Sequence, residues 1–169
     1  RLKRAGETHA YTPEEIQEFL ACKESVVRFA SHFKIQTIDE GLKTIELWDI
    51  QKKILQEMQD NRFCALNFPR QSSKTTLATI MILWDTIFKK YRRFFILANK
   101  EDTSKEVLER IKLAFEYLPD FLKPGIEEWN KKSIKFDNGS TIYAATTTSD
   151  SIRGKTGNLY CDETAFIDK

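Results

Sequence analysis

The sequence lacks the features that mark several broad classes of protein. No apolar run approaches the roughly 20 residues that a membrane-spanning helix needs. The first four residues contain neither the apolar core of a secretory signal nor an initiator methionine. Internal repeats and low-complexity stretches are also missing. These absences favour one globular domain of 169 residues, and the missing methionine indicates a fragment or an excised domain.

Cysteine and net charge are scarce as well. Cys22, Cys64 and Cys161 have no metal-binding spacing, and we expect them to be buried, reduced thiols of a cytoplasmic protein. A net charge of +2 is too small to indicate nucleic-acid binding by itself. The densest basic cluster, Lys89-Lys90 with Arg92-Arg93, is interpreted as a solvated helix end. The apolar content of 41% is enough for a substantial core.

The most informative segment is residues 68–76, which read FPRQSSKTT. An apolar run at 63–66 precedes it, and a long helical pattern beginning near Thr75 follows it. Strand, tight loop, Lys-Thr and helix is the construction of a P-loop, in which backbone N–H groups cradle phosphates. The match to G-x-x-x-x-G-K-[ST] is imperfect, since Phe68 and Ser73 replace the two glycines. The alternative is a Lys-Thr pair at the start of an ordinary helix.

A second segment strengthens the interpretation of residues 68–76 as a P-loop. Residues 159–161 form a short apolar run that ends in Asp162 and Glu163, which is typical of a Walker B strand. Asp162 would hold Mg²⁺ through water, and Glu163 would orient and activate the attacking water. The alternative is a strand end followed by a solvated turn. A P-loop followed later by Asp-Glu is the chain order that a nucleoside triphosphatase requires.

The remaining patterns predict an N-terminal appendage (1–46) and a core (47–169). In the appendage, Thr12, Pro13 and Glu15 form a capping box that starts a helix, and a short helix and a hairpin follow at 25–33 and 34–45. In the core we expect helices at 47–58, 75–90 and 103–117, strands at 63–66 and 94–98, an irregular stretch at 120–129, a hairpin at 132–144 and the strand at 159–161.

This alternation of apolar strands and helices predicts an α/β P-loop NTPase fold, with a mainly parallel sheet flanked by helices. Ligands of such sheets bind outside the carboxyl ends of the strands. We therefore expect Lys74 and Asp162 to converge on one pocket at one rim of the sheet. The sheet is expected to be incomplete at its C-terminal side, because the sequence stops soon after Glu163.

Several stretches together resemble one known family. They are RQSSKTT (70–76), LPDFLKPGI (118–126), EWNK (128–131), DNGS (137–140), SIRGK (151–155) and YCDETAFI (160–167). The chain resembles the ATPase domain of large terminase subunits, the DNA-packaging motors of tailed bacteriophages, and most closely that of T-even-like phages. The resemblance spans most of the chain from about residue 47 onward.

The resemblance implies a role for each matching position. Lys74 is similar to the Walker A lysine, Thr75 to the hydroxyl that ligates Mg²⁺, and Arg70 to an arginine that contacts the γ-phosphate. Asp162 and Glu163 are similar to the Walker B aspartate and the catalytic carboxylate. Residues that complete the expected nucleotide site are Gln51, Gln71, Ser72, Ser73 and Thr76.

Some of these roles have alternatives on the residues alone. Gln51, implied to recognise adenine, is also explained as a polar residue beside a core stripe, and Arg70 as a solvated loop arginine. The role of Arg153-Gly154, which matches a family pair, stays open. Ser73 stands where the family has glycine, and serine fits there if its φ is negative.

The implied activity is ATP hydrolysis with Mg²⁺ that drives double-stranded DNA into a prohead. The implied partners are DNA, the portal and the small terminase subunit, with an oligomeric ring assembled on the portal in the host cytoplasm. The nuclease domain of the family has no counterpart in this sequence. Two rival interpretations are a helicase-like nucleic-acid translocase and a degenerate nucleotide-binding or assembly module that does not hydrolyse ATP.

Overall fold

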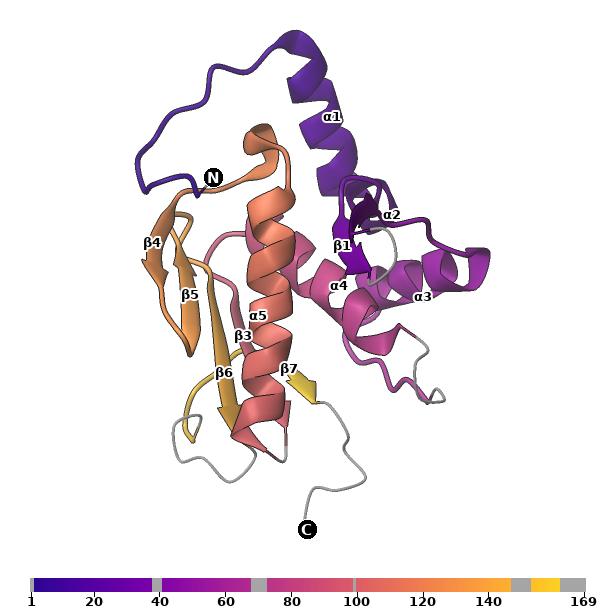
Figure 1. The fold of residues 1–169 in the computed structure, drawn as a ribbon, viewed down its shortest axis with the longest axis vertical. Helices are drawn as coiled ribbons and strands as arrows, with labels where there is room; N and C mark the ends of the chain where they lie inside the picture. The colour runs from indigo at the N-terminus through magenta and orange to yellow at the C-terminus, as the bar shows by residue number, and fades with distance from the viewer. Residues whose placement is uncertain (1, 38–40, 68–72, 99, 147–152, 162–169) are drawn as a thin grey trace.

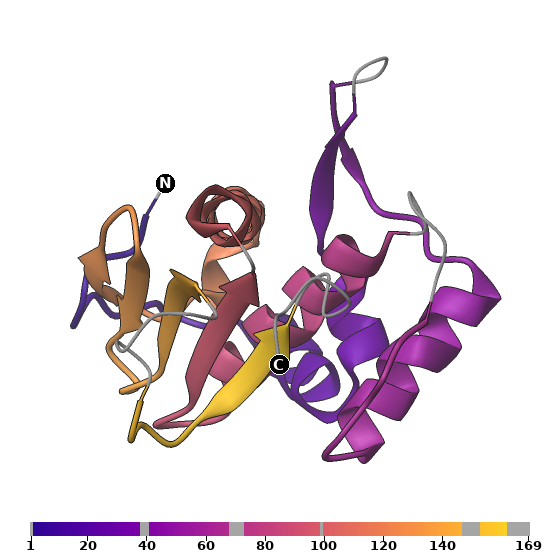
Figure 2. The same cartoon turned by 90° about the horizontal axis from the view of Figure 1, so that it is seen from below.

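The computed structural model describes residues 2–37, 41–67, 73–98, 100–146 and 153–161. Figure 1 shows a sheet crossed by one long helix, α5 (Glu101–Tyr117), with the other helices gathered to one side. Figure 2 shows α5 on one face of the sheet and no described helix over the opposite face. No helix in the described part of the chain is both long and apolar enough to cross a membrane.

The N-terminal elements confirm the sequence-based expectation. Helix α1 (Pro13–Glu24) begins with the predicted capping box, in which the Thr12 hydroxyl accepts from the Glu15 N–H and the Glu15 carboxylate accepts from the Thr12 N–H. Helix α2 (Val26–Ala30) and a hairpin of β1 (Lys34–Thr37) and β2 (Gly41–Thr44) follow. The indole of Trp84 donates to the carbonyl of Cys22 at 2.8 Å, which connects α1 to helix α4 (Lys74–Phe88).

The two helices that flank the expected P-loop also form as predicted. Helix α3 spans Asp49–Asp60, and α4 spans Lys74–Phe88. Helix α4 is apolar over most of its surface, and most of its residues are buried among α2, α3, α5 and β3. Its buried Asp85 is paired with Lys89 and with Arg92, at 2.6 and 2.5 Å. The basic cluster at 89–93 therefore neutralises a buried carboxylate as well as ending the helix.

The sheet has the strand order β4-β5-β6-β3-β7. Its strands are β3 (Arg93–Ala98), β4 (Ile126–Trp129), β5 (Ser133–Phe136), β6 (Thr141–Thr146) and β7 (Asn158–Cys161). Strand β3 pairs parallel with β6 and β7, whereas β5 pairs antiparallel with both β4 and β6. The expectation of a mainly parallel sheet is corrected to a mixed sheet, because the tight turn at Asn138 and Gly139 reverses the chain.

Two expected segments differ from the structure. Residues 120–129, predicted to be irregular, contain the 3-10 helix η1 (Asp120–Leu122) and strand β4, which pairs with β5. Residues 63–66, predicted to be a strand, have no strand conformation, and the Phe63 side chain is 83% exposed. An apolar run becomes a strand only where it pairs, and no described strand pairs with this one.

The expectation that all three cysteines are buried holds for one of them. Cys22 is fully buried as expected, but Cys64 and Cys161 are exposed. Cys64 lies in the segment that does not join the sheet, and Cys161 lies on β7, at the edge of the sheet.

The hydrophobic core has two parts, one on each face of the sheet. Side chains alternate along β3, so Phe94 and Ile96 face the helices while Phe95 and Leu97 face the other side.

Candidate nucleotide site

The candidate site begins at the first turn of α4. Lys74 is the first residue of this helix, and Thr75 and Thr76 follow it in the same turn. The Thr75 carbonyl accepts a hydrogen bond from the Thr79 hydroxyl at 2.7 Å. The N-cap side chain makes no capping hydrogen bond, and the first turn carries no acidic residue. The first N–H groups of the helix have no acceptor within the helix, and together with the positive end of the helix dipole they favour an anion such as phosphate.

The N-cap residue Ser73 adopts φ +62° and ψ +17°, which is the left-handed region. The condition under which serine was expected to fit, a negative φ, is therefore not met. The backbone takes the conformation that glycine adopts at little cost, and the serine Cβ makes it costly by about 1 kcal/mol. The chain therefore keeps a glycine-like backbone at this position although the glycine itself is missing.

We expect Ser73→Gly to raise the free energy of unfolding by about 0.5–1 kcal/mol, because it relieves the left-handed strain. Urea denaturation measures this change. Ser25→Gly is the matched control at the N-cap of α2, where φ is −133° and the Ser25 hydroxyl accepts from the Arg28 N–H. That substitution should lower stability by a few tenths of a kcal/mol. Destabilisation by Ser73→Gly would contradict the interpretation.

Gln51 lies in the first turn of α3 and is 8% exposed. Its side-chain Oε1 accepts from the backbone N–H of Trp48 at 2.9 Å, so the amide caps the helix. The described residues provide no hydrogen-bond partner for its Nε2, which leaves a donor for a base edge. Helix α3 packs directly against α4. Gln51 is thus beside the core, as the simpler interpretation expected, and adenine recognition stays a prediction.

The carboxyl end of β7 provides the other half of the candidate site. Cys161, its last residue, pairs with Leu97 near the end of β3, so the two strands end at the same rim. In Figure 1 the arrowheads of β6 and β7 lie at the same lower end of the sheet. The chain continues directly into Asp162 and Glu163. These two residues, with Arg70, Gln71 and Ser72, lie outside the described residues, and their convergence with Lys74 stays a prediction.

One cluster elsewhere resembles a metal site. Donor atoms of Glu18, Cys22 and His32 lie within 4.8 Å of one another. Arg28, however, donates to both oxygens of Glu18, at 2.8 and 2.7 Å. His32 contacts the same carboxylate at 2.7 Å. The guanidinium already occupies the place of a cation, and the cluster is best explained as an ion-pair network that joins α1 to α2.

The network predicts a pH dependence of stability. Hydrogen bonds from Arg28 lower the pKa of Glu18 to about 2, and burial opposes them. Because the folded pKa lies below the unfolded value of about 4.5, this stabilisation is present above pH 4.5 and disappears as the pH falls towards 2. Glu18→Gln should cost about 1 kcal/mol at pH 7 and progressively less below pH 4.5. Urea denaturation across this range tests it, with the exposed Glu46→Gln as charge-matched control; a constant cost for Glu18→Gln would contradict it.

Comparison with known proteins identifies the family. A sequence model described as "Terminase large subunit, T4likevirus-type, N-terminal" matches residues 65–169. The chain belongs to this family. The match contains the start of α4, strand β7 and the Asp162-Glu163 pair that follows it.

A solved structure is similar over most of this terminase chain. The crystal structure of the HK97 bacteriophage large terminase matches it with a TM-score of 0.68 and 19% sequence identity. The match covers 86% of this chain and 32% of the HK97 chain. The similarity shows the fold, and the chain spans about a third of the length of the protein it matches.

Proposed function

We propose that the chain is the ATP-hydrolysing part of a phage large terminase, which drives double-stranded DNA into a prohead. The observation that carries the proposal is the family match over 65–169, which contains both halves of the candidate site. The first turn of α4 supports it, because Ser73 has a backbone conformation that glycine adopts at little cost and the turn itself carries no acidic residue.

In the proposed mechanism, the N–H groups at the start of α4 and the Lys74 ammonium hold the β- and γ-phosphates of ATP. Arg70 stabilises the charge that develops on the transferred phosphoryl group. Glu163 orients the attacking water and accepts its proton. Thr75 and Asp162 would hold Mg²⁺, which neutralises phosphate charge when bound. Gln51 would donate its Nε2–H to the edge of adenine.

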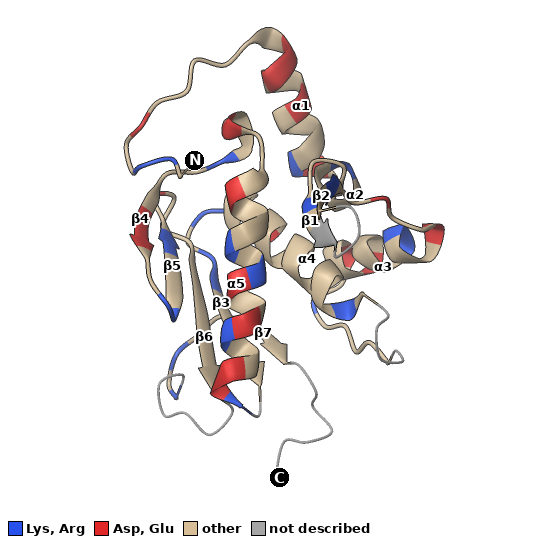
Figure 3. Cartoon of the chain, viewed as in Figure 1, with Lys and Arg blue, Asp and Glu red and all other residues tan. Residues whose placement is uncertain are grey.

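The partners belong to the same proposal. The full-length protein would contact DNA, the portal of the prohead and the small terminase subunit, as an oligomeric ring in the host cytoplasm. The ring gives each subunit access to the DNA that passes through its centre. Figure 3 shows acidic and basic residues side by side along α5, so this helix does not present a purely basic surface to DNA.

The decisive experiment is titration of the full-length protein with a fluorescent ATP analogue, with and without Mg²⁺. Lys74→Ala should weaken binding by about 10- to 100-fold, because it removes a charge-assisted contact to phosphate. Lys23→Ala, at an exposed position at the end of α1, is the matched control and should bind as the parent does. Unchanged binding by Lys74→Ala would overturn the nucleotide site.

The same titration, combined with a measurement of phosphate release, separates an active ATPase from a degenerate module that does not hydrolyse ATP. Tight, Mg²⁺-dependent binding together with phosphate release supports an ATPase. Tight binding without phosphate release would instead support a nucleotide-binding or assembly module. The left-handed backbone of Ser73, which glycine adopts at little cost, supports nucleotide binding in both cases, so phosphate release decides between them.

A further inference from the structure

A groove of about 620 Å³ lies along β6, which has β5 on one side and β3 on the other. It opens where β5 no longer covers β6, since Ser133 is the first residue of β5 and pairs with Tyr143. The turn between β4 and β5 provides Lys131 and Lys132, and the segment before β7 provides Lys155. No sequence pattern predicts this groove, because its residues come from separate segments of the chain.

The floor of the groove is aromatic and fixed in place. The Tyr143 ring stacks on the Phe95 ring, with centroids 5.6 Å apart and planes 17° from parallel. Phe95 is almost completely buried, so Tyr143 rests on the core of the sheet. The ammonium of Lys155 lies 5.8 Å from the centre of the Tyr143 ring, within reach of a cation–π interaction. The floor therefore holds one lysine above an aromatic surface.

The charge of the groove is positive. Among the described residues that line the groove, the one acidic residue is Glu101, which is paired with Lys132 at 2.8 Å and with Lys105 at 3.2 Å. Two ammonium groups therefore offset this one carboxylate. Lys131 and Lys155 are exposed and add further positive charge. An anion that enters the groove meets an excess of ammonium groups and little repulsion.

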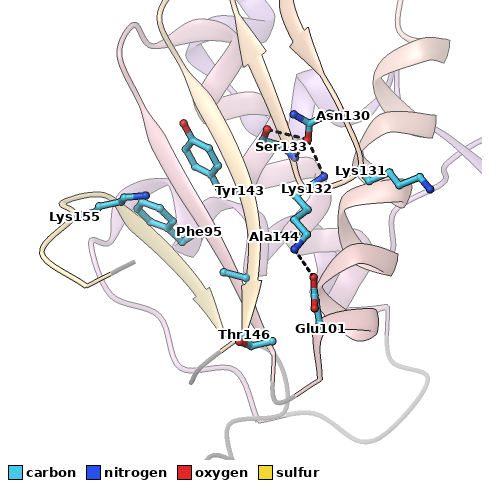
Figure 4. A pocket seen from close by; sticks show the side chains of 11 residues that line it. Phe95, Glu101, Asn130, Lys131, Lys132, Ser133, Tyr143, Ala144, Thr146 and Lys155 are labelled. Atoms are coloured by element: carbon cyan, nitrogen blue, oxygen red, sulfur yellow. Dashed lines mark hydrogen bonds and ion pairs between the residues drawn. The ribbon is translucent and has the colours of Figure 1, made fainter. Parts of the chain in front are cut away.

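The lysines are spread along the groove. Figure 4 shows Lys155 on one side of Tyr143, and Lys131 and Lys132 on the other. A small anion needs donors that converge on one point, whereas these donors are arranged on either side of an open floor. Such an arrangement suits an extended polyanion whose charges repeat along its length.

We propose that this groove binds the phosphodiester backbone of double-stranded DNA. The proposal rests on the proposed function and adds to it the surface that contacts the DNA. Lys131 and Lys155 contact phosphates directly, and Lys132 is held in position by Glu101. Such contacts carry no sequence information, as suits a protein that must move along any DNA sequence.

The test compares the full-length protein with the double variant Lys131→Ala/Lys155→Ala. Fluorescence anisotropy measures the binding of a short random-sequence duplex at several salt concentrations. The variant should bind on the order of tenfold more weakly near physiological salt, and the slope of log K against log salt should fall by about one unit per lysine removed. Lys23→Ala/Lys34→Ala removes two exposed lysines elsewhere and should bind as the parent does.

Unchanged DNA affinity and an unchanged salt slope in the groove variant would overturn the groove proposal. The proposed ATPase function would stand, because the parent would still hydrolyse ATP. Displacement of the duplex by excess ATP in the Lys74→Ala background would also overturn it, because the groove would then be a nucleotide site. Failure of the proposed function gives a different result. The parent would then neither bind nor hydrolyse ATP, even if the groove variant weakened DNA binding as expected.

Discussion

Replacing Arg70 by alanine is expected to lower the rate of ATP hydrolysis by about three orders of magnitude or more, with ATP binding still detectable. The residue stands four positions before Lys74, within the expected phosphate loop. An arginine there acts on charge that develops in the transition state, so its loss should reduce kcat far more than affinity. Steady-state phosphate release and analogue binding, both measured in the full-length protein, separate the two quantities.

Two further variants show whether the guanidinium itself is required. Arg70→Lys keeps the charge but loses the planar fork, and it should recover only a small part of the rate. Arg110→Ala removes an exposed arginine on α5 and should hydrolyse ATP at the parental rate. If Arg70→Ala turned over ATP as fast as the control, Arg70 would be a solvated loop residue.

The helices could be predicted because their signals are local. Thr12, Pro13 and Glu15 specify the start of α1 within four residues, and the structure contains both hydrogen bonds of the capping box. The apolar pattern of α4 required burial on most sides, and the helix is buried. Such features depend on neighbours in the sequence, so no knowledge of the tertiary fold is needed to predict them.

The strands were predicted less well because a strand depends on its partner. Residues 63–66 have a strand-like composition but no described partner, whereas β4 has a weak pattern and pairs with β5. The exposure of Cys161 has the same origin, since it follows from the place of β7 at the edge of the sheet. Strand order is a long-range property that apolar runs do not encode.

At the candidate site, the sequence predicted where helix α4 begins but not the backbone conformation of the residue before it. Lys74 and Thr75 begin α4 as the pattern requires. The left-handed conformation of Ser73 could not be predicted, because serine ordinarily avoids it and only the path of the chain imposes it. The pairing of Asp85 with Lys89 was available from their four-residue spacing, whereas the contact with Arg92 depends on the turn that follows α4.

The second large effect is expected for Glu163→Gln, which should lower ATP hydrolysis by about two to four orders of magnitude. Glutamine has nearly the same shape but cannot accept the proton of the attacking water at neutral pH. Because the substitution leaves phosphate and Mg²⁺ ligands in place, Mg²⁺-dependent binding of the ATP analogue should be retained. Single-turnover phosphate release measures the chemical step directly.

The neighbouring Asp162→Asn provides the contrast that assigns the two carboxylates. If Asp162 helps to hold Mg²⁺, the asparagine that replaces it should weaken both the Mg²⁺ dependence of nucleotide binding and the rate of hydrolysis. Glu57→Gln, exposed on α3, removes the same charge elsewhere and should leave both properties unchanged. Loss of Mg²⁺-dependent binding in Glu163→Gln but not in Asp162→Asn would exchange the proposed roles. Parental hydrolysis in Glu163→Gln would remove this residue from the mechanism.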